Sequence, residues 1–317
     1  MKKKNYSIPS CDGKTALHVI CRIPDSEPKA VIQIIHGMVE YIERYEDFAK
    51  FLTDQGYVVF GHDHLGHGQS VTSIENWGYV ADSRPADALI RDIHRVRSAA
   101  QSLYPDLPYY MLGHSMGSYL LRRYLSLKAE GLKGAIIVGT GQENDVTTTA
   151  GLSMISAMAK AKGWHHRSLK IRDMTYTAPY KIYDLNGIDK SNSWICSDPE
   201  IMEKYYSDPR CTFTFTLNGY EALLTTVRYV NQKRNINKIP KDLPILLVSG
   251  ELDPVGNLGK GVKYVYNKYV EAGIKDIECH LFPDMRHEIL NEPAHSEVYS
   301  FIQDWINRTL VYNYEKS

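Results

Sequence analysis

The chain has 317 residues, of which 43% are hydrophobic and 23% charged, so it can bury a sizeable core in one large domain or two smaller ones. Its 37 Lys and Arg residues balance its 37 Asp and Glu residues. This balance argues against nucleic acid as a partner, because the chain has no excess of positive charge to neutralise phosphates. The sequence contains no run of 18 apolar residues, which argues against a transmembrane helix.

The first residues lack the apolar stretch of a signal peptide, because the basic start at residues 1–4 is followed by the polar, turn-like segment 8–13. Five scattered cysteines without a CxxC pair are typical of reduced thiols. We therefore expect the protein to be located in the cytoplasm. Residues 6–9 and 16–23 predict a hairpin at the edge of a sheet.

Short apolar runs alternate with amphipathic helical segments along most of the chain. Residues 30–35 (AVIQII) predict a buried strand, and residues 43–55 predict a helix that buries Phe48 and Leu52 on one face. Gly56 ends this helix, and a strand (YVVF) follows. The same pattern predicts further helices at 88–103, 118–129, 262–272 and 296–309, and further strands at 109–112, 134–138, 244–248 and 277–282.

This alternation is typical of crossover connections, so we expect an α/β fold with a mostly parallel central sheet flanked by helices. The alternation stops between residues 140 and 225, a stretch too long for a structureless loop in a compact domain. We predict a helical cap or lid at residues 141–225, with a helix at 150–162, above the carboxyl ends of the strands, where such sheets bind ligands. The core then consists of residues 1–140 and 226–317.

The segment Gly113-His114-Ser115-Met116-Gly117 fits the pattern G-x-S-x-G and lies between a predicted strand and a predicted helix. A serine at the tip of such a sharp turn has a strained backbone, and glycines two residues away on either side remove steric collisions. This context favours a nucleophilic serine over an ordinary glycine-rich turn.

Two later loops can supply the groups that activate this serine. Asp253 and His287 each follow one of the last two predicted strands, so the order Ser, Asp, His matches that of an α/β-hydrolase fold. A serine hydroxyl needs a base to accept its proton, and the base needs a carboxylate to fix its tautomer. We therefore predict Ser115 as nucleophile, His287 as general base and Asp253 as orienting acid, with Glu251 and Asp284 as rival acids.

An oxyanion hole is expected at His36-Gly37-Met38, directly after the strand at residues 30–35. A glycine there lets the backbone approach the substrate, and the N–H groups of Met38 and Met116 are the predicted donors. The histidine-rich segment 61–68 has the spacing of metal ligands, but we interpret it as a structural loop beside the active site. We expect neither a metal nor another cofactor.

Several segments resemble the monoacylglycerol lipase and lysophospholipase branch of the α/β-hydrolases, an S33 serine aminopeptidase-like family. The resemblance covers nearly the whole chain, is weakest at residues 150–193, and departs at Met38, where the family pattern has alanine. Only the backbone of Met38 is expected to take part, but its side chain narrows the pocket. The matching segments are His36-Gly37 with Glu40, Arg44 and Tyr45, and residues 62–70, 113–117, 205–211, 249–253 and 285–287.

The resemblance implies hydrolysis of a carboxylic ester with a single acyl chain, such as a monoacylglycerol or a lysophospholipid, through an acyl-enzyme. It does not decide the head group or the length of the acyl chain. The cap helix suggests either a lid that lines an acyl tunnel or touches a membrane surface, or simple packing on the core. The expected substrate contacts are Gly37, Glu40, His114, Met154, Ile155 and Met158.

Other functions remain open on the same fold. A serine aminopeptidase would keep the triad and would need acidic residues such as Glu40 or Glu143 to hold a substrate amine, and an esterase for small esters would need no tunnel. A non-catalytic ligand-binding protein would usually have lost a member of the triad, and all three are present. We expect a small-molecule or lipid ester as partner, no nucleic acid, and transient contact of the cap with a membrane surface. The oligomeric state is left open.

Overall fold

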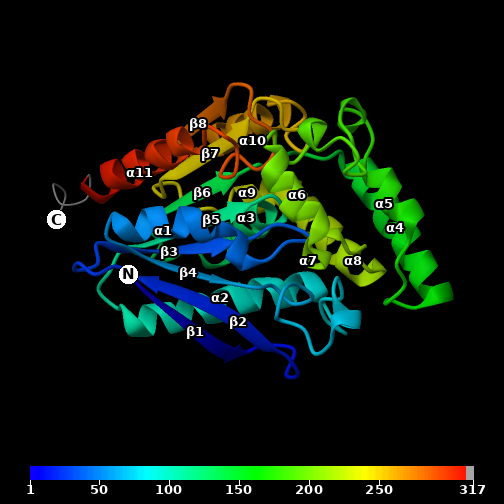
Figure 1. Cartoon of the computed structure of the whole chain (residues 1–317), viewed down its shortest axis with the longest axis horizontal. Helices are drawn as coiled ribbons and strands as arrows, with labels where there is room; N and C mark the ends of the chain where they lie inside the picture. Colours follow the sequence, from blue (N-terminus) through cyan, green and yellow to red (C-terminus); the bar gives the residue numbers. More distant parts are fainter. Residues whose placement is uncertain (312–317) are drawn as a thin grey trace.

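The computed structural model describes residues 1–311, and within these residues one sheet of eight strands lies between layers of helices (Figure 1). The strand order is β1-β2-β4-β3-β5-β6-β7-β8; β3 to β8 run parallel, and β1 and β2 form an antiparallel edge. This confirms the predicted α/β fold. The strands are β1 (Lys2–Pro9), β2 (Ala16–Ile23), β3 (Ala30–Ile35), β4 (Tyr57–His62), β5 (Tyr109–His114), β6 (Gly134–Val138), β7 (Ile245–Gly250) and β8 (Ile277–Phe282).

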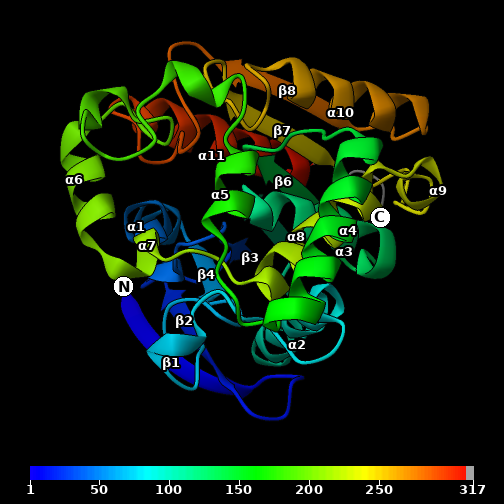
Figure 2. The ribbon, with the colours of Figure 1, turned by 90° about the vertical axis from the view of Figure 1, so that its right-hand side faces the viewer.

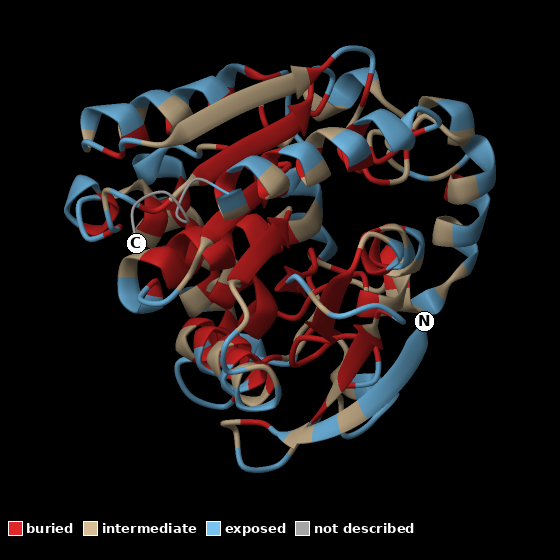
Figure 3. Ribbon diagram, turned by 90° about the vertical axis from the view of Figure 1, so that its left-hand side faces the viewer, coloured by how far each residue is buried: buried red, intermediate tan, exposed pale blue. Residues whose placement is uncertain are grey.

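Each face of the sheet is covered by helices, so its inner strands are buried on both sides (Figure 3). In β3, Val31 and Ile35 pack with the helices of one face, whereas Ile32 and Ile34 pack with those of the other. Burial on both faces explains why these strands read as continuous apolar runs. The first face carries α2 (Pro85–Leu103), α3 (Met116–Lys128) and α10 (Lys260–Glu271), and the second carries α1 (Glu46–Asp54) and α11 (His295–Val311).

Each of the predicted helices begins one to five residues away from its predicted start. A 3₁₀ turn, η1 (Ile42–Tyr45), precedes α1, so the helix expected from residue 43 starts at Glu46. The first cap helix, α4 (Asp145–Lys162), starts five residues before the expected residue 150, because the side chain of Asn144 accepts a hydrogen bond from the Val146 N–H. This N-cap satisfies a donor that the helix start would otherwise leave unpaired.

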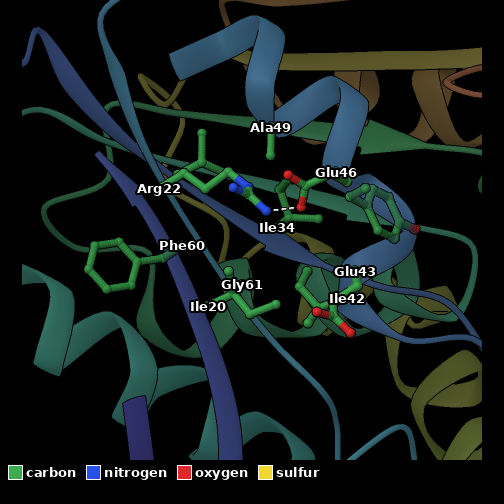
Figure 4. Close-up of a pocket in the computed structure, with 11 residues that line it drawn as sticks. Ile20, Arg22, Ile34, Ile42, Glu43, Glu46, Ala49, Phe60 and Gly61 are labelled. Carbon is green, nitrogen blue, oxygen red and sulfur yellow. Dashed lines mark ion pairs between the residues drawn. The ribbon is translucent and has the colours of Figure 1, made fainter. Parts of the chain in front are cut away.

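A buried arginine joins the antiparallel edge of the sheet to α1 (Figure 4). Arg22 of β2 is almost fully buried and forms an ion pair with Glu46, the first residue of α1. The two side chains border a void of about 20 Å³, which apolar residues such as Ile34 and Ala49 also line. Because the void is only water-sized, we interpret this contact as structural.

The chain between β6 and β7 forms the cap, which lies at one end of the sheet (Figures 1 and 2). Its long helix α8 packs against α4 in the cap and against α2 and α3 in the core, and residue 225 lies within it. The domain limits at 141 and 225 stay a prediction. The cap helices are α4, α5 (Leu169–Thr175), α6 (Pro199–Ser207), α7 (Pro209–Thr212), α8 (Leu217–Asn231) and α9 (Lys233–Ile236), with 3₁₀ turns η3 (Tyr180–Ile182) and η4 (Lys190–Asn192); a further turn, η2 (Ile74–Asn76), precedes α2.

Within residues 1–311, none of the helices combines the length and the apolar composition needed to cross a lipid bilayer.

Candidate active site

Ser115 occupies a strained turn between β5 and α3, with φ of 54° and ψ of −122°. The turn lies close to neighbouring backbone: a Cβ atom at Gly117 would collide with the carbonyl oxygen of Ile35, and one at Gly113 would collide with that of Gly117. The Ser115 N–H donates to the carbonyl of Val138 at 3.0 Å. The two glycines therefore permit a backbone conformation that other residues rarely adopt, as the G-x-S-x-G pattern predicts.

Asp253 and His287 lie side by side in loops that follow β7 and β8. The Nδ1 atom of His287 donates to Oδ2 of Asp253 at 2.9 Å, and both side chains are buried. Asp253 also accepts from the hydroxyl of Ser249 at 3.0 Å and from the N–H of Val255 at 2.8 Å. These bonds fix the carboxylate and leave Nε2 as the nitrogen that can accept a proton.

The rival acids lie elsewhere. Glu251 and Asp284 are both exposed, although each is within three residues of a member of the predicted triad. Of the three carboxylates, Asp253 is the one that accepts a hydrogen bond from His287.

Ser115 and His287 both line a cavity of about 590 Å³ beneath the cap. On the core side the same cavity is bordered by Met38, Glu40 and His114. The cap contributes seven aromatic residues to the wall, together with the charged Arg172, Asp173 and Lys181, so a bound ligand would contact flat apolar surfaces, hydroxyl groups and charged groups. These aromatic residues are Tyr176, Trp194, Tyr205, Tyr206, Phe213, Phe215 and Tyr220.

The loop after β3, which contains the predicted oxyanion donor Met38, lies close to Ser115. A Cβ atom at Gly37 would lie 3.0 Å from the Cβ of Ser115 and would also collide with Glu40. The N–H of Gly37 donates to Oε1 of Glu40 at 2.5 Å, which fixes the turn that carries Met38. Met116 is the first residue of α3, and the first N–H groups of a helix have no hydrogen-bond partner within the helix.

Glu40 and His114, both predicted as substrate contacts, already have partners in the protein. Oε1 of Glu40 accepts from the hydroxyl of Tyr45 at 2.9 Å and faces Nδ1 of His114 at 3.3 Å. Nε2 of His114 donates to the carbonyl of His287 at 3.2 Å, since a carbonyl oxygen only accepts.

The electrostatics of this pair follow from its geometry. Burial alone would raise the pKa of Glu40. The hydrogen bond to His114 and the positive charges of His114 and Arg44 outweigh burial, so the pKa of Glu40 lies below its usual range. Burial lowers the pKa of His114, and the hydrogen bond to Glu40 outweighs it, so the pKa is raised. The two groups form a buried ion pair beneath His287.

The histidine-rich segment packs as a block behind the loop after β3. The rings of His36, His62, His64 and His67 lie with centroids 4.2–6.2 Å apart. Burial lowers the pKa of His62 and of His67 to about 3, so both rings are neutral at physiological pH. Over residues 1–311, no group of three or more His, Cys, Asp or Glu side chains is arranged to hold a metal ion.

The structure corrects the expectation for Met154, Ile155 and Met158. None of the three is among the residues that border the cavity. Ile155 is fully buried in the apolar cluster of the core, and Met154 and Met158 pack against the same cluster. Because α4 packs on α8, its apolar face is turned to the core, and the loop around Leu185, α6 and α7 supplies cavity wall instead.

Trp194 and Glu288 both line the cavity, although no sequence pattern predicted a role for either residue. Glu288 directly follows His287 and accepts two hydrogen bonds from Arg44, at 2.5 and 2.7 Å. The available signals were weak: a tryptophan among small polar residues in the cap, and a glutamate beside the predicted base.

Residues 26–294 match the family model described as serine aminopeptidase, S33. The chain is 37% identical over 251 residues to a monoglyceride lipase of Rattus norvegicus, covering 77% of this chain and 71% of that protein. It is 24% identical over 284 residues to a monoacylglycerol lipase of Mycolicibacterium smegmatis, covering 89% and 90% of the two chains. Among solved structures, a highly thermostable carboxyl esterase from Bacillus coagulans in complex with glycerol has a TM-score of 0.89 at 29% identity, covering 98% of this chain and 100% of that one.

Proposed function

This chain belongs to the S33 family of α/β-hydrolases and, within it, to the relatives of monoacylglycerol lipase; it is a serine hydrolase that acts on esters, and we propose that Ser115, His287 and Asp253 are its catalytic triad. One observation carries this proposal: the buried His287–Asp253 pair, with its 2.9 Å hydrogen bond, borders the same cavity as the strained Ser115.

In this mechanism Ser115 attacks the ester carbonyl while Nε2 of His287 accepts its proton. His287 then returns the proton to the departing alcohol, and Ser115 retains the acyl group as an ester. A water molecule, deprotonated in the same way, releases the acid and restores the serine. Asp253 keeps the proton on Nδ1 of His287 throughout.

The backbone N–H groups of Met38 and Met116 are proposed to stabilise the negative charge that develops on the carbonyl oxygen. Support comes from the close approach of Gly37 to Ser115 and from the position of Met116 at the start of α3. One donor of this kind contributes about 3–4 kcal/mol to transition-state stabilisation.

The proposed substrate is an ester with one acyl chain, such as a monoacylglycerol or a lysophospholipid. Two relatives support this proposal, since the rat and mycobacterial proteins are named for monoglyceride and monoacylglycerol. The size of the cavity supports it as well, because about 590 Å³ is typical of a site for a drug-sized ligand.

Aminopeptidase activity is disfavoured by the ion pairs at the cavity. A substrate amine needs a carboxylate that is free to bind it. Glu288 is paired with Arg44, Asp173 with Arg172 at 2.7 Å, and Glu40 with His114. Glu143, the other predicted candidate, is exposed and does not border the cavity.

We also propose that the cap touches a lipid surface when it collects substrate. Leu169, Met174, Ile182 and Ile188 are large apolar side chains that are more than half exposed on the cap. Residues 169–188 contain three basic and two acidic side chains, so the proposed contact rests mainly on the exposed apolar side chains. Replacing these four residues by serine should weaken sedimentation with anionic vesicles and leave hydrolysis of a soluble ester unchanged. Undiminished sedimentation would refute this contact.

Activity profiling tests the proposed function. The purified protein should hydrolyse p-nitrophenyl esters and monoacylglycerol, and a fluorophosphonate should label Ser115. Ser115→Ala should lose both activity and labelling while keeping its melting temperature, because the hydroxyl faces the cavity. Labelling at another residue, or unchanged turnover by the variant, would refute the assignment. The relative rates on monoacylglycerol, lysophosphatidylcholine and aminoacyl amides decide the substrate class.

A further inference from the structure

We propose that Trp194, carried by the cap, is a positioning residue for His287. It lies in residues 191–197, which we call the tryptophan strap; this segment runs from the end of η4 towards α6. This inference rests on the proposed role of His287 as general base. It assigns to the cap a part in the geometry of the base, in addition to its part in enclosing the substrate.

The imidazole of His287 is in contact with one ring from the core and one from the cap. Its centroid lies 4.7 Å from that of His114 and 5.1 Å from that of Trp194, with interplanar angles of 40° and 34°. The hydrogen bond from Nδ1 to Asp253 fixes one corner of the imidazole, but it leaves the ring free to tilt about that bond. Contact with flat rings restricts this tilt, and the direction of Nε2 depends on it.

The tryptophan strap is bound directly to the loop that carries His287. Arg286 donates from Nη1 to the carbonyls of Ser191 at 2.9 Å and of Ser193 at 2.5 Å. On the other side of His287, the N–H of Glu288 donates to the carbonyl of Ile195 at 2.7 Å. Both residues that flank the base therefore bind the residues that flank Trp194.

A buried carboxylate ties the same two segments together. Glu292 is only 1% exposed, and it accepts from the N–H of Ser197 at 3.1 Å and from the N–H of Arg286 at 2.9 Å. The thiol of Cys196 adds a contact to the carbonyl of Asn291 at 3.3 Å. The strap and the histidine loop consequently form one hydrogen-bonded unit, and the position of Trp194 relative to His287 is set by this unit.

Trp194 also connects His287 to the aromatic wall of the cavity. Its ring lies 5.2 Å from that of Tyr180 and 6.0 Å from that of Tyr176, and Tyr176 borders the cavity. A residue that served only as wall would affect how tightly the substrate binds. A residue that orients the base affects the chemical step, because a displacement of about 1 Å in a catalytic group lowers the rate by about a hundredfold.

Kinetics on a soluble ester separate these two roles. We expect Trp194→Ala to lower kcat by about ten- to a hundredfold with KM changed by less than about threefold, and Trp194→Phe to restore most of kcat because it keeps a flat ring. Trp164→Ala is the matched control, since Trp164 is a partly exposed cap tryptophan outside the cavity, and it should behave as wild type. A raised KM with unchanged kcat in Trp194→Ala, or a Phe variant as slow as the Ala variant, would overturn the proposal.

Fluorescence tests the contact without using activity. An imidazole ring quenches a tryptophan that it touches, so the emission of Trp194, obtained as wild type minus Trp194→Phe, should be weaker than the emission of Trp194 in a His287→Leu background. The second value is obtained as His287→Leu minus the double variant that also carries Trp194→Phe. Equal emission of Trp194 in the two backgrounds would refute the contact. Absence of all esterase activity together with normal quenching would instead refute the proposed function.

Discussion

Arg44 and Glu288 are 244 residues apart in the chain and form a bidentate ion pair, with Nη1–Oε1 and Nη2–Oε2 distances of 2.5 and 2.7 Å. Arg44 lies in the turn before α1, on the segment that also carries Gly37 and Met38, and Glu288 directly follows His287. The pair thus connects the loop proposed to supply an oxyanion donor with the loop proposed to supply the base. Burial lowers the pKa of Arg44, and Glu288 and Glu40 outweigh that effect and raise it well above its ordinary value.

We predict that Arg44→Met destabilises the protein by about 3–5 kcal/mol, because it leaves the buried carboxylate of Glu288 without its positively charged partner. The side chains of the pair are only 10% and 6% exposed. Arg308→Met is the matched control: its 2.8 Å pair with Glu278 is 54% and 41% exposed. Such a surface pair contributes at most about 1 kcal/mol. Urea unfolding measures both variants, and equal losses would contradict the prediction.

Asp253→Asn should lower kcat by about 10⁴-fold, since an amide favours the wrong tautomer of His287. Glu251→Gln is its control, because Glu251 lies two residues away on the same turn and is exposed. Steady-state kinetics on a p-nitrophenyl ester give both values. If Glu251→Gln is the more damaging change, the acid is misassigned.

The ion pair of Glu40 and His114 should make stability depend on pH in a defined direction. The pKa of His114 is raised above its ordinary value of 6.5, so its contribution is complete below pH 6.5 and is lost as the pH rises through the folded-state pKa. The pKa of Glu40 is lowered from 4.5, so its contribution is present above pH 4.5 and is lost on acidification. The stability difference between wild type and His114→Gln, from urea unfolding, should therefore be larger at pH 5.5 than at pH 8.5. A difference that grows with pH would contradict the proposed charge state.

The packing of α4 changes what substitutions in the cap should do. Met158→Asp is expected to lower the melting temperature and to reduce rates on short and long esters alike, because Met158 packs on the core. Leu185→Asp, on the cavity wall, should spare acetyl esters and impair long-chain esters. Each buried methylene contributes about 0.8 kcal/mol, so losing contact with three or four methylenes lowers kcat/KM by about 60- to 200-fold. Rates of both variants on a series of esters with increasing acyl-chain length distinguish these results. A loss restricted to long-chain esters in Met158→Asp would instead indicate that α4 lines the cavity.

The sequence alone predicted those parts of the site that depend on local rules. A serine at a positive φ needs flanking glycines, so Gly113 and Gly117 marked the turn around Ser115 before its backbone was known. Parallel strands end at one edge of a sheet, so Asp253 and His287 were expected near Ser115 from their places after β7 and β8.

Only the tertiary structure decided which groups touch. Met154, Ile155 and Met158 form the same apolar pattern whether they face a tunnel or a core, because hydrophobic periodicity shows which side of a helix is buried but not what covers it. The contact of Trp194 with His287 joins two residues that lie 93 positions apart in the chain, and no local pattern predicts such a pair. Side-chain contacts of this range are set by the packing of the cap on the core, and this packing depends on the shape of both surfaces, which a single sequence does not display.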